Sequence, residues 1–208
     1  MSAAPAVRVK ICGVRSVDDA LAAVRAGADM IGLNFHPASR RYVEREEASR
    51  ISAAIPASVW CVGVFVDRVR EEIEEVRAKV RHDAIQLHGD EPTEMLQGWR
   101  VPVIRAVRLR SGEDATRAVR EFCPDFFLCE GVSERGHGGV GARFDWTWAE
   151  AFPADRLFLV GGLDPGNVAE AVRAVRPFAV DVASGVESSP GRKEPALVAE
   201  FVNNAKAA

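Results

Sequence analysis

The sequence has little of what cross-links or metal-stapled domains are built from. Only four of its 208 residues are cysteine, at positions 12, 61, 123 and 129, with no CxxC pair and no histidine at zinc-finger spacing. We therefore expect neither disulfides nor a structural metal site. Cys61, Cys123 and Cys129 lie in or beside apolar runs, which is typical of structural cysteines. Cysteine used in this way makes a cytoplasmic location the default expectation.

Long apolar runs and a strong charge of one sign are also missing. The longest apolar run, counting glycine, is Val59 to Val66. A membrane span needs about 20 such residues. The first ten residues show no basic head followed by an apolar stretch, so no secretion signal is expected. The net charge is −3 and the 27 basic residues are scattered, so neither nucleic acid nor a membrane is an expected partner.

What the sequence does have is regular alternation between short β-branched runs and amphipathic stretches. The strand candidates are Val7–Ile11, Met30–Phe35, Val59–Val66, Ala84–Leu87, Val101–Ala106, Phe126–Cys129, Leu157–Val160 and Ala179–Val182. Apolar residues recur at helical spacing between them. The helical candidates are Val17–Arg25, Arg45–Ala54, Arg70–Val80, Thr93–Trp99, Gly112–Arg120, Trp146–Ala151, Gly166–Val175 and Pro195–Ala205.

Eight strand–helix pairs joined by short loops predict an α/β fold, a single (β/α)8 TIM barrel spanning residues 1–208. The strands are almost wholly apolar, as parallel strands covered on both faces are. An open doubly wound sheet is the alternative, and its first turn would be rich in glycine. Here that turn, Cys12 to Arg15, has a single glycine. Capping residues support two helix starts, Ser16 before Val17 and Asp164 before Pro165.

Glycine-containing turns follow the last two predicted strands, at Gly161-Gly162 and Ser184-Gly185. In a TIM barrel the active site lies at the carboxyl ends of the strands, and phosphate often binds after strands seven and eight. Backbone N–H groups hold a phosphate well where glycine lets the chain approach it closely. The alternative is that Gly161 and Gly162 merely permit a tight turn, but glycine-containing turns after both of the last two strands favour a phosphate site.

Five side chains with reactive groups lie at the same predicted rim. Cys12 could be a thiolate base or a buried small hydrophobe, and Glu130 could be a proton-holding acid or a member of a rim salt bridge. Arg41 suits bidentate recognition of a carboxylate. His88 and Asp181 are expected to bind substrate. His88 could instead be a general base or a core histidine, and Asp181 could act only as a structural hydrogen-bond acceptor.

Longer motifs resemble the phosphoribosylanthranilate isomerase family, from about Val9 to the C-terminus. The resemblance rests on KICGV at 10–14, GADMIGLNFHPASRRYV at 27–43, VGVFVD at 62–67, QLHGDEP at 86–92, GHGGVGARFDW at 136–146, GGLDPGNV at 161–168 and VDVASGVESSPGRKE at 180–194. It implies an Amadori rearrangement of N-(5-phosphoribosyl)anthranilate to 1-(2-carboxyphenylamino)-1-deoxyribulose 5-phosphate in tryptophan biosynthesis. It also implies that no metal or organic cofactor takes part.

The resemblance further assigns roles to residues. It implies that Cys12 is the general base, that Arg41 pairs with the anthranilate carboxylate, and that the two glycine-containing turns bind the phosphate. The family's acid is usually an aspartate ending strand six, where this chain has Glu130, one methylene longer. Glu130 is therefore either an accommodated replacement or the mark of an altered enzyme.

Two other functions remain as alternatives at this point. One is a barrel isomerase that acts on the aminoimidazole carboxamide ribotide of histidine biosynthesis, but that chemistry has an aspartate where Cys12 stands. The other is a non-catalytic barrel that binds a phosphorylated ligand. In each case the partner is a small phosphorylated molecule. The sequence leaves monomer and homodimer equally open.

Overall fold

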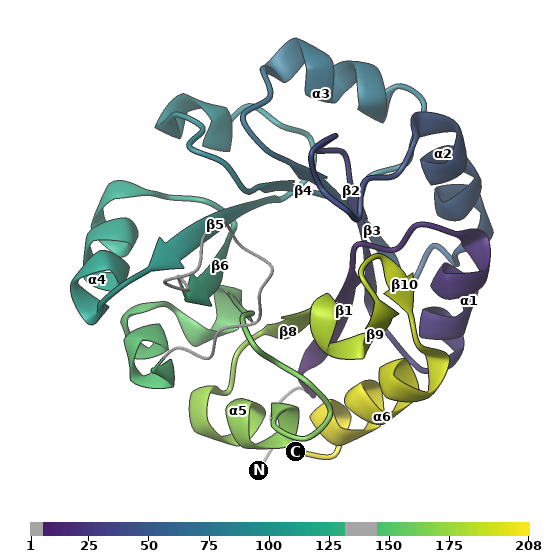
Figure 1. The fold of residues 1–208 in the computed structure, drawn as a ribbon. Helices are drawn as coiled ribbons and strands as arrows, with labels where there is room; N and C mark the ends of the chain where they lie inside the picture. The colour runs from purple at the N-terminus through teal and green to yellow at the C-terminus, as the bar shows by residue number, and fades with distance from the viewer. Residues whose placement is uncertain (1–5, 132–144) are drawn as a thin grey trace.

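The computed structural model describes residues 6–131 and 145–208. Eight parallel strands follow one another around a closed barrel, and β1 pairs with both β2 and β8 (Figure 1). This confirms the predicted TIM barrel. The strands are β1 (Arg8–Cys12), β2 (Met30–Asn34), β3 (Trp60–Phe65), β4 (Ala84–Leu87), β5 (Val103–Leu109), β6 (Phe126–Gly131), β7 (Leu157–Leu159) and β8 (Ala179–Val182).

Helices surround the barrel on its outside (Figure 1). The α-helices are α1 (Val17–Arg25), α2 (Arg45–Ala54), α3 (Arg70–Arg77), α4 (Gly112–Glu121), α5 (Val168–Val175) and α6 (Pro195–Lys206). Short 3-10 helices are η1 (Thr93–Leu96), η2 (Trp146–Ala151), η3 (Ala154–Arg156) and η4 (Ser184–Val186). Among residues 6–131 and 145–208, no helix is long and apolar enough to cross a membrane.

Two apolar cores follow from the alternation of side chains along each strand. One core fills the space between strands and helices, with members such as Val9, Ile11 and Phe201. The other fills the inside of the barrel. Its buried members are Met30, Val62, Ala84, Ile104, Ala106, Leu128, Phe158 and Ala179. Side chains that continue this inner face toward the carboxyl ends of the strands must therefore point into the barrel mouth.

Two predicted helices are wrong in type, and one begins later than predicted. Residues 93–99 and 146–151 were expected as helices, but the first is a single 3-10 turn and the second is 3-10 throughout. Gly98, at φ 78°, follows the first, and Pro153 follows Phe152 after the second. Both residue types end helices early. The helix predicted from Gly166 begins at Val168, because Asp164 closes a turn by accepting the Gly166 N–H instead of capping the helix.

The sequence reading missed a small hairpin at the barrel mouth. It is formed by β9 (Glu187–Ser189) and β10 (Arg192–Lys193), which pair antiparallel with a register shift between Arg192 and Lys193. In Figure 1 the hairpin lies on the inner side of α1, close to β1. The C-terminal residue of β10, Lys193, is almost fully buried. The hairpin therefore carries charged side chains into the mouth of the barrel.

Candidate active site

Alternation along three strands brings the reactive side chains to the barrel mouth. Cys12 follows buried Lys10 by two residues on β1, and Glu130 follows Leu128 of the inner core by two residues on β6. His88 follows Ala84 by four residues, just past the end of β4. A period of two places each on the inner face of its strand. The predicted rim positions of these three residues follow from this geometry.

A buried ion pair lies beneath Cys12. Lys10 on β1 and Asp181 on β8 are register partners, and Lys10 Nζ donates to Asp181 Oδ2 at 2.9 Å. The side chains are 0% and 3% exposed. The Cys12 Sγ lies over Gly32 of β2, where an added Cβ would come within 2.9 Å of the sulfur. Asp181, predicted to bind substrate, therefore holds Lys10 in this structure, while its Oδ1 has no partner among the described residues.

Burial raises the pKa of the Cys12 thiol above its ordinary value. The positive charge of Lys10 is the largest opposing effect, and Lys193 acts in the same direction more weakly, while Asp181 adds to the rise. A thiolate base requires nearby positive charge, which Lys10 and Lys193 provide. Their effect on the pKa is smaller than that of burial. In this structure the thiol form of Cys12 is therefore favoured over the thiolate.

Glu130 lies at the opposite side of the site in contact with a histidine. His88 Nε2 is 3.1 Å from Glu130 Oε2, and His88 Nδ1 is 2.7 Å from Gln86 Nε2. The side chains of His88 and Glu130 are 24% and 12% exposed, whereas Gln86 is buried. With the amide oriented in this way, Gln86 donates to Nδ1, so the proton of a neutral ring is on Nε2 and is donated to the Glu130 carboxylate.

The same three side chains can also hold a protonated Glu130. If the Gln86 amide turns over, its oxygen accepts from Nδ1–H, and the free Nε2 accepts the carboxylic proton of Glu130. The turn is compatible with the surroundings, because Gln86 Oε1 has no partner among the described residues. The trio can therefore support both states of an acid that gives up a proton.

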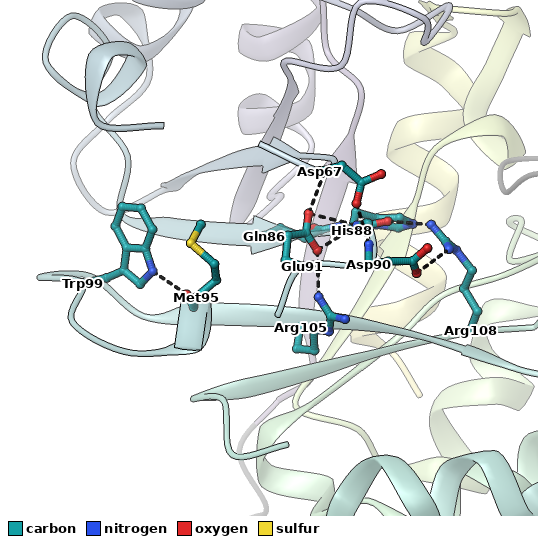
Figure 2. Close-up of polar contacts among 10 residues, drawn as sticks. Asp67, Gln86, His88, Asp90, Glu91, Met95, Trp99, Arg105 and Arg108 are labelled. Carbon is teal, nitrogen blue, oxygen red and sulfur yellow. Dashed lines mark hydrogen bonds and ion pairs between the residues drawn. The ribbon is translucent and has the colours of Figure 1, made fainter. Parts of the chain in front are cut away.

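The loop after β4 is fixed by a buried carboxylate (Figure 2). Glu91 accepts N–H bonds from Gly89 and Asp67 and pairs with Arg105 Nη1 at 2.7 Å. Its side chain is 1% exposed. Arg108 Nη2 donates to the backbone oxygen of His88 at 2.8 Å. These bonds hold the backbone that carries His88, so they place the histidine against Glu130.

Arg41 is held at the mouth by a second carboxylate. Its Nε and Nη2 donate to the two oxygens of Glu187 at 2.7 and 2.8 Å. The Glu187 hydrogen bond is the main cause that raises the pKa of Arg41. The stem of Arg41 packs over Gly13, next to Cys12, while Cys12 and Glu130 end β1 and β6 at the barrel mouth, so the three residues belong to one site. The carboxylate that Arg41 binds in this structure belongs to the protein itself.

The turns after β7 and β8 touch each other, as a shared phosphate cradle requires. Gly161 and Gly162 have φ of 102° and 63°, which other residues rarely adopt. A Cβ on Gly185 would collide with the backbone oxygen of Leu163. Ser184 begins η4 beside them and is exposed. The structure thus brings all four predicted phosphate-binding residues together.

Several residues of this site were missed or given no role from sequence. They are Gln86, Glu91, Arg105, Glu187 and Lys193. Glu91 and Arg105 serve the site indirectly, because they hold the loop that carries His88. A signal was present for Gln86 and Arg105, which lie within apolar strand runs, because amide and charged side chains are costly to bury without partners. The polar hairpin that carries Glu187 and Lys193 gave no such signal. Across the part of the chain that the structure describes, no group of three or more His, Cys, Asp or Glu side chains could hold a metal ion.

A charged site with an acid, a thiol and two glycine-containing turns, at the carboxyl ends of a closed (β/α)8 barrel, defines a TIM-barrel enzyme for a phosphorylated ligand. The family model of N-(5'-phosphoribosyl)anthranilate (PRA) isomerase matches residues 9–204. The isomerase of Geobacter sulfurreducens is 44% identical over 96% of this chain and 98% of its own. The chain belongs to the N-(5'-phosphoribosyl)anthranilate isomerase family.

Solved structures agree with this assignment. Phosphoribosyl anthranilate isomerase from Thermotoga maritima matches with a TM-score of 0.87 and 43% identity, over 97% of this chain and 100% of that one. A second match, with a TM-score of 0.84 and 42% identity over 97% and 100% of the two chains, is a complex with reduced 1-(o-carboxyphenylamino)-1-deoxyribulose 5-phosphate. The family assignment does not favour the non-catalytic barrel that the sequence left open.

Proposed function

We propose that this chain isomerises N-(5'-phosphoribosyl)anthranilate to 1-(2-carboxyphenylamino)-1-deoxyribulose 5-phosphate, a step of tryptophan biosynthesis. The observation that carries the proposal is that Cys12, Glu130 and Arg41 lie together at the mouth of a barrel of this family. The substrate has a phosphate and a carboxylate at its two ends. The glycine-containing turns and Arg41 offer matching sites for these two anions.

Glu130 would act first, as the general acid. Its proton passes to the ring oxygen of the ribose, the bond from that oxygen to C1′ breaks, and C1′ becomes an iminium carbon. His88 supports this role, because it contacts Glu130 at 3.1 Å and can hold the carboxyl in either protonation state. The longer side chain of glutamate is accommodated here by its contact with that histidine.

Cys12 would act second, as the general base. The thiolate removes the C2′ proton, the electrons of that bond form the enolamine, and the iminium is neutralised. The enolamine then takes up a proton at C1′, its C2′ hydroxyl gives up a proton, and the C2′ ketone forms. The positive charge of the iminium helps here, because it favours the thiolate that burial disfavours in the free enzyme. Lys10 and Lys193 add positive charge from the protein.

Complementation tests the activity in a cell. A bacterial tryptophan auxotroph that lacks this isomerisation step should grow without tryptophan when it carries this chain. The same strain carrying the Cys12→Ala variant should not grow, because the base is missing. Growth with neither chain, although both are present as folded protein, would refute the proposed activity.

Three further properties are part of the proposal. The barrel closes on itself between β1 and β8, which supports residues 1–208 as one domain. Cys12 and the exposed Cys123 are free thiols, which fits a reducing cytoplasm. We expect this chain to be a monomer or a homodimer. The Thermotoga maritima enzyme is dimeric, and a structure of monomers generated from it is also known.

A further inference from the structure

Three charged side chains, two of them buried, form a continuous chain at the barrel mouth. Lys193 Nζ on β10 lies 2.9 Å from Glu187 Oε1 on β9, and Glu187 in turn binds Arg41 on the loop after β2. The side chains of Lys193 and Glu187 are 2% and 4% exposed, and that of Arg41 is 17% exposed. Ion pairs this deeply buried are costly to form, so a purely structural role explains them poorly.

Each end of this chain of charges is attached to a different part of the candidate site. Lys193 Nζ also donates to the backbone oxygen of Ala183 at 2.9 Å, immediately before the turn at Ser184 and Gly185. At the other end, the stem of Arg41 packs over Gly13, where an added Cβ would lie 2.5 Å from Arg41 Cδ. Gly13 follows Cys12. The chain therefore connects the predicted phosphate turn with the residue next to the predicted base.

The hairpin is shaped to make this connection. Its turn residue Gly191 has a φ of 84°, and an added Cβ there would lie 2.8 Å from the backbone oxygen of Arg40. The turn thus presses directly on the residue before Arg41. On the other side of the contact, Ser39 Oγ accepts the Arg41 N–H at 3.1 Å. Both the backbone and the side chain of Arg41 are fixed.

The pairing leaves one edge of the guanidinium for another anion. Glu187 occupies the Nε and Nη2 edge, whereas the edge formed by Nη1 and Nη2 faces away from it. A planar guanidinium can bind a carboxylate on each of these edges. Two cations and one anion also leave the trio with one positive charge in excess. A second carboxylate on the open edge would neutralise it.

We propose that Glu187 and Lys193 are positioning residues that aim the open edge of Arg41 at the carboxylate of the substrate and tie that aim to the phosphate turn. The inference rests on the proposed function and adds to it the two residues on which recognition of the carboxylate depends. Glu187 and Lys193 touch Arg41 or the turn and need not touch the substrate. The competing explanation is that Glu187 merely compensates the buried charge of Lys193.

Two ligands that differ in one group separate these explanations. The first is reduced 1-(o-carboxyphenylamino)-1-deoxyribulose 5-phosphate, which carries both anions. The second is its phenylamino counterpart, which has the phosphate but no carboxylate. In titration calorimetry, Glu187→Gln should weaken the first ligand by at least about tenfold, since misaligned contacts commonly cost up to about 100-fold. It should change the second by less than about twofold.

A double-mutant cycle adds a second readout. An Arg41→Met background has no guanidinium for Glu187 to position. Glu187→Gln should therefore have no further effect on binding of the carboxylate ligand in that background. In steady-state kinetics the single variant should raise KM more than it lowers kcat. Glu47→Gln is the matched control, because it removes the carboxylate partner of the exposed Arg50 by the same substitution, on a helix outside the barrel. That control should leave both affinities unchanged.

The variant Glu187→Gln/Lys193→Met removes both buried charges at once and guards against misfolding of the single variant. It should melt near the wild-type temperature yet still bind the carboxylate ligand at least about tenfold more weakly. Equal weakening of both ligands, or additive effects with Arg41→Met, would overturn the positioning role while leaving the activity intact. Failure of the wild-type chain to bind either ligand would instead overturn the proposed function.

Discussion

At the scale of single residues, burial decides which groups hold protons. Cys12, partly exposed at the barrel mouth, and His82, which is buried, are each pushed toward the neutral form by the surrounding protein. For Cys12 the neutral form is the thiol, which cannot act as the proposed base. The positive charge of the proposed iminium intermediate would favour the reactive thiolate. For His82 the neutral form is the unprotonated ring, packed edge-on against Phe35 and Phe65 outside the barrel. The first shift concerns reactivity and the second concerns stability.

Alkylation measures the protonation of Cys12. In a Cys123→Ser background, which removes the exposed thiol, the rate of reaction with iodoacetamide should rise with a midpoint above the ordinary thiol pKa of 9.0. Lys10→Met should move the midpoint upward, because Lys10 lowers the thiol pKa and Asp181 raises it. The midpoint of the double variant Lys10→Met/Asp181→Asn should lie between the midpoints of the Cys123→Ser protein and of Lys10→Met. A downward shift in Lys10→Met would contradict the account.

The stability of the protein should depend on pH through His82. Burial and the charge of Arg77 lower the pKa of His82 from 6.5 to about 3. Between these values the unfolded chain binds a proton that the folded chain does not, so the free energy of unfolding falls as the pH decreases below 6.5. One such group contributes at most about 1.4 kcal/mol per pH unit.

The His82→Leu variant removes this group. Urea unfolding of the wild type and the variant at pH 4.5 to 7 should show a shallower dependence for the variant, by up to one proton. Identical slopes would mean that His82 takes up a proton as readily in the folded protein as in the unfolded chain, and would contradict the lowered pKa. The comparison of slopes is independent of any overall loss of stability that the substitution causes.

At the scale of elements, the contact between the turns after β7 and β8 should control phosphate binding. Gly185→Ala would place a methyl group on the backbone oxygen of Leu163, so the turns must separate. We expect KM for the substrate, and Kd for its reduced product analogue, to rise by about tenfold or more. The matched control is Gly112→Ala, whose added Cβ makes an ordinary 3.5 Å contact with Trp148.

That control should bind ligand normally and be as stable as the wild type or slightly more so, because alanine is the better helix former. Unchanged affinity in Gly185→Ala would place the phosphate elsewhere.

Strand positions at this scale were readily predicted from sequence, since apolar runs flanked by breaks define them. Helix type was not, because the short segments at 93–96 and 146–151 depend on which tertiary contacts and following prolines or glycines end them.

At the scale of the whole molecule, closure of the barrel is what gathers the site. Cys12 and Asp181 come from β1 and β8, and only closure makes these strands neighbours. The eight predicted strand–helix pairs indicated a closed barrel, and so predicted that such residues share one rim. The pattern could not predict their partners, because Lys10–Asp181 and Arg41–Glu187 join residues more than a hundred positions apart. The hairpin carrying Lys193 escaped prediction since two short strands of polar residues have no apolar pattern.

In the proposed reaction, Glu130 supplies the acid from the position where the resemblance to the family implies an aspartate. The most direct measurement is turnover of freshly prepared N-(5'-phosphoribosyl)anthranilate by the wild type, Glu130→Asp and Glu130→Gln. The account predicts that the wild type is active and that Glu130→Gln loses at least about 100-fold in kcat, with Glu130→Asp between them. Near-full turnover by Glu130→Gln would remove Glu130 from the mechanism and contradict the account.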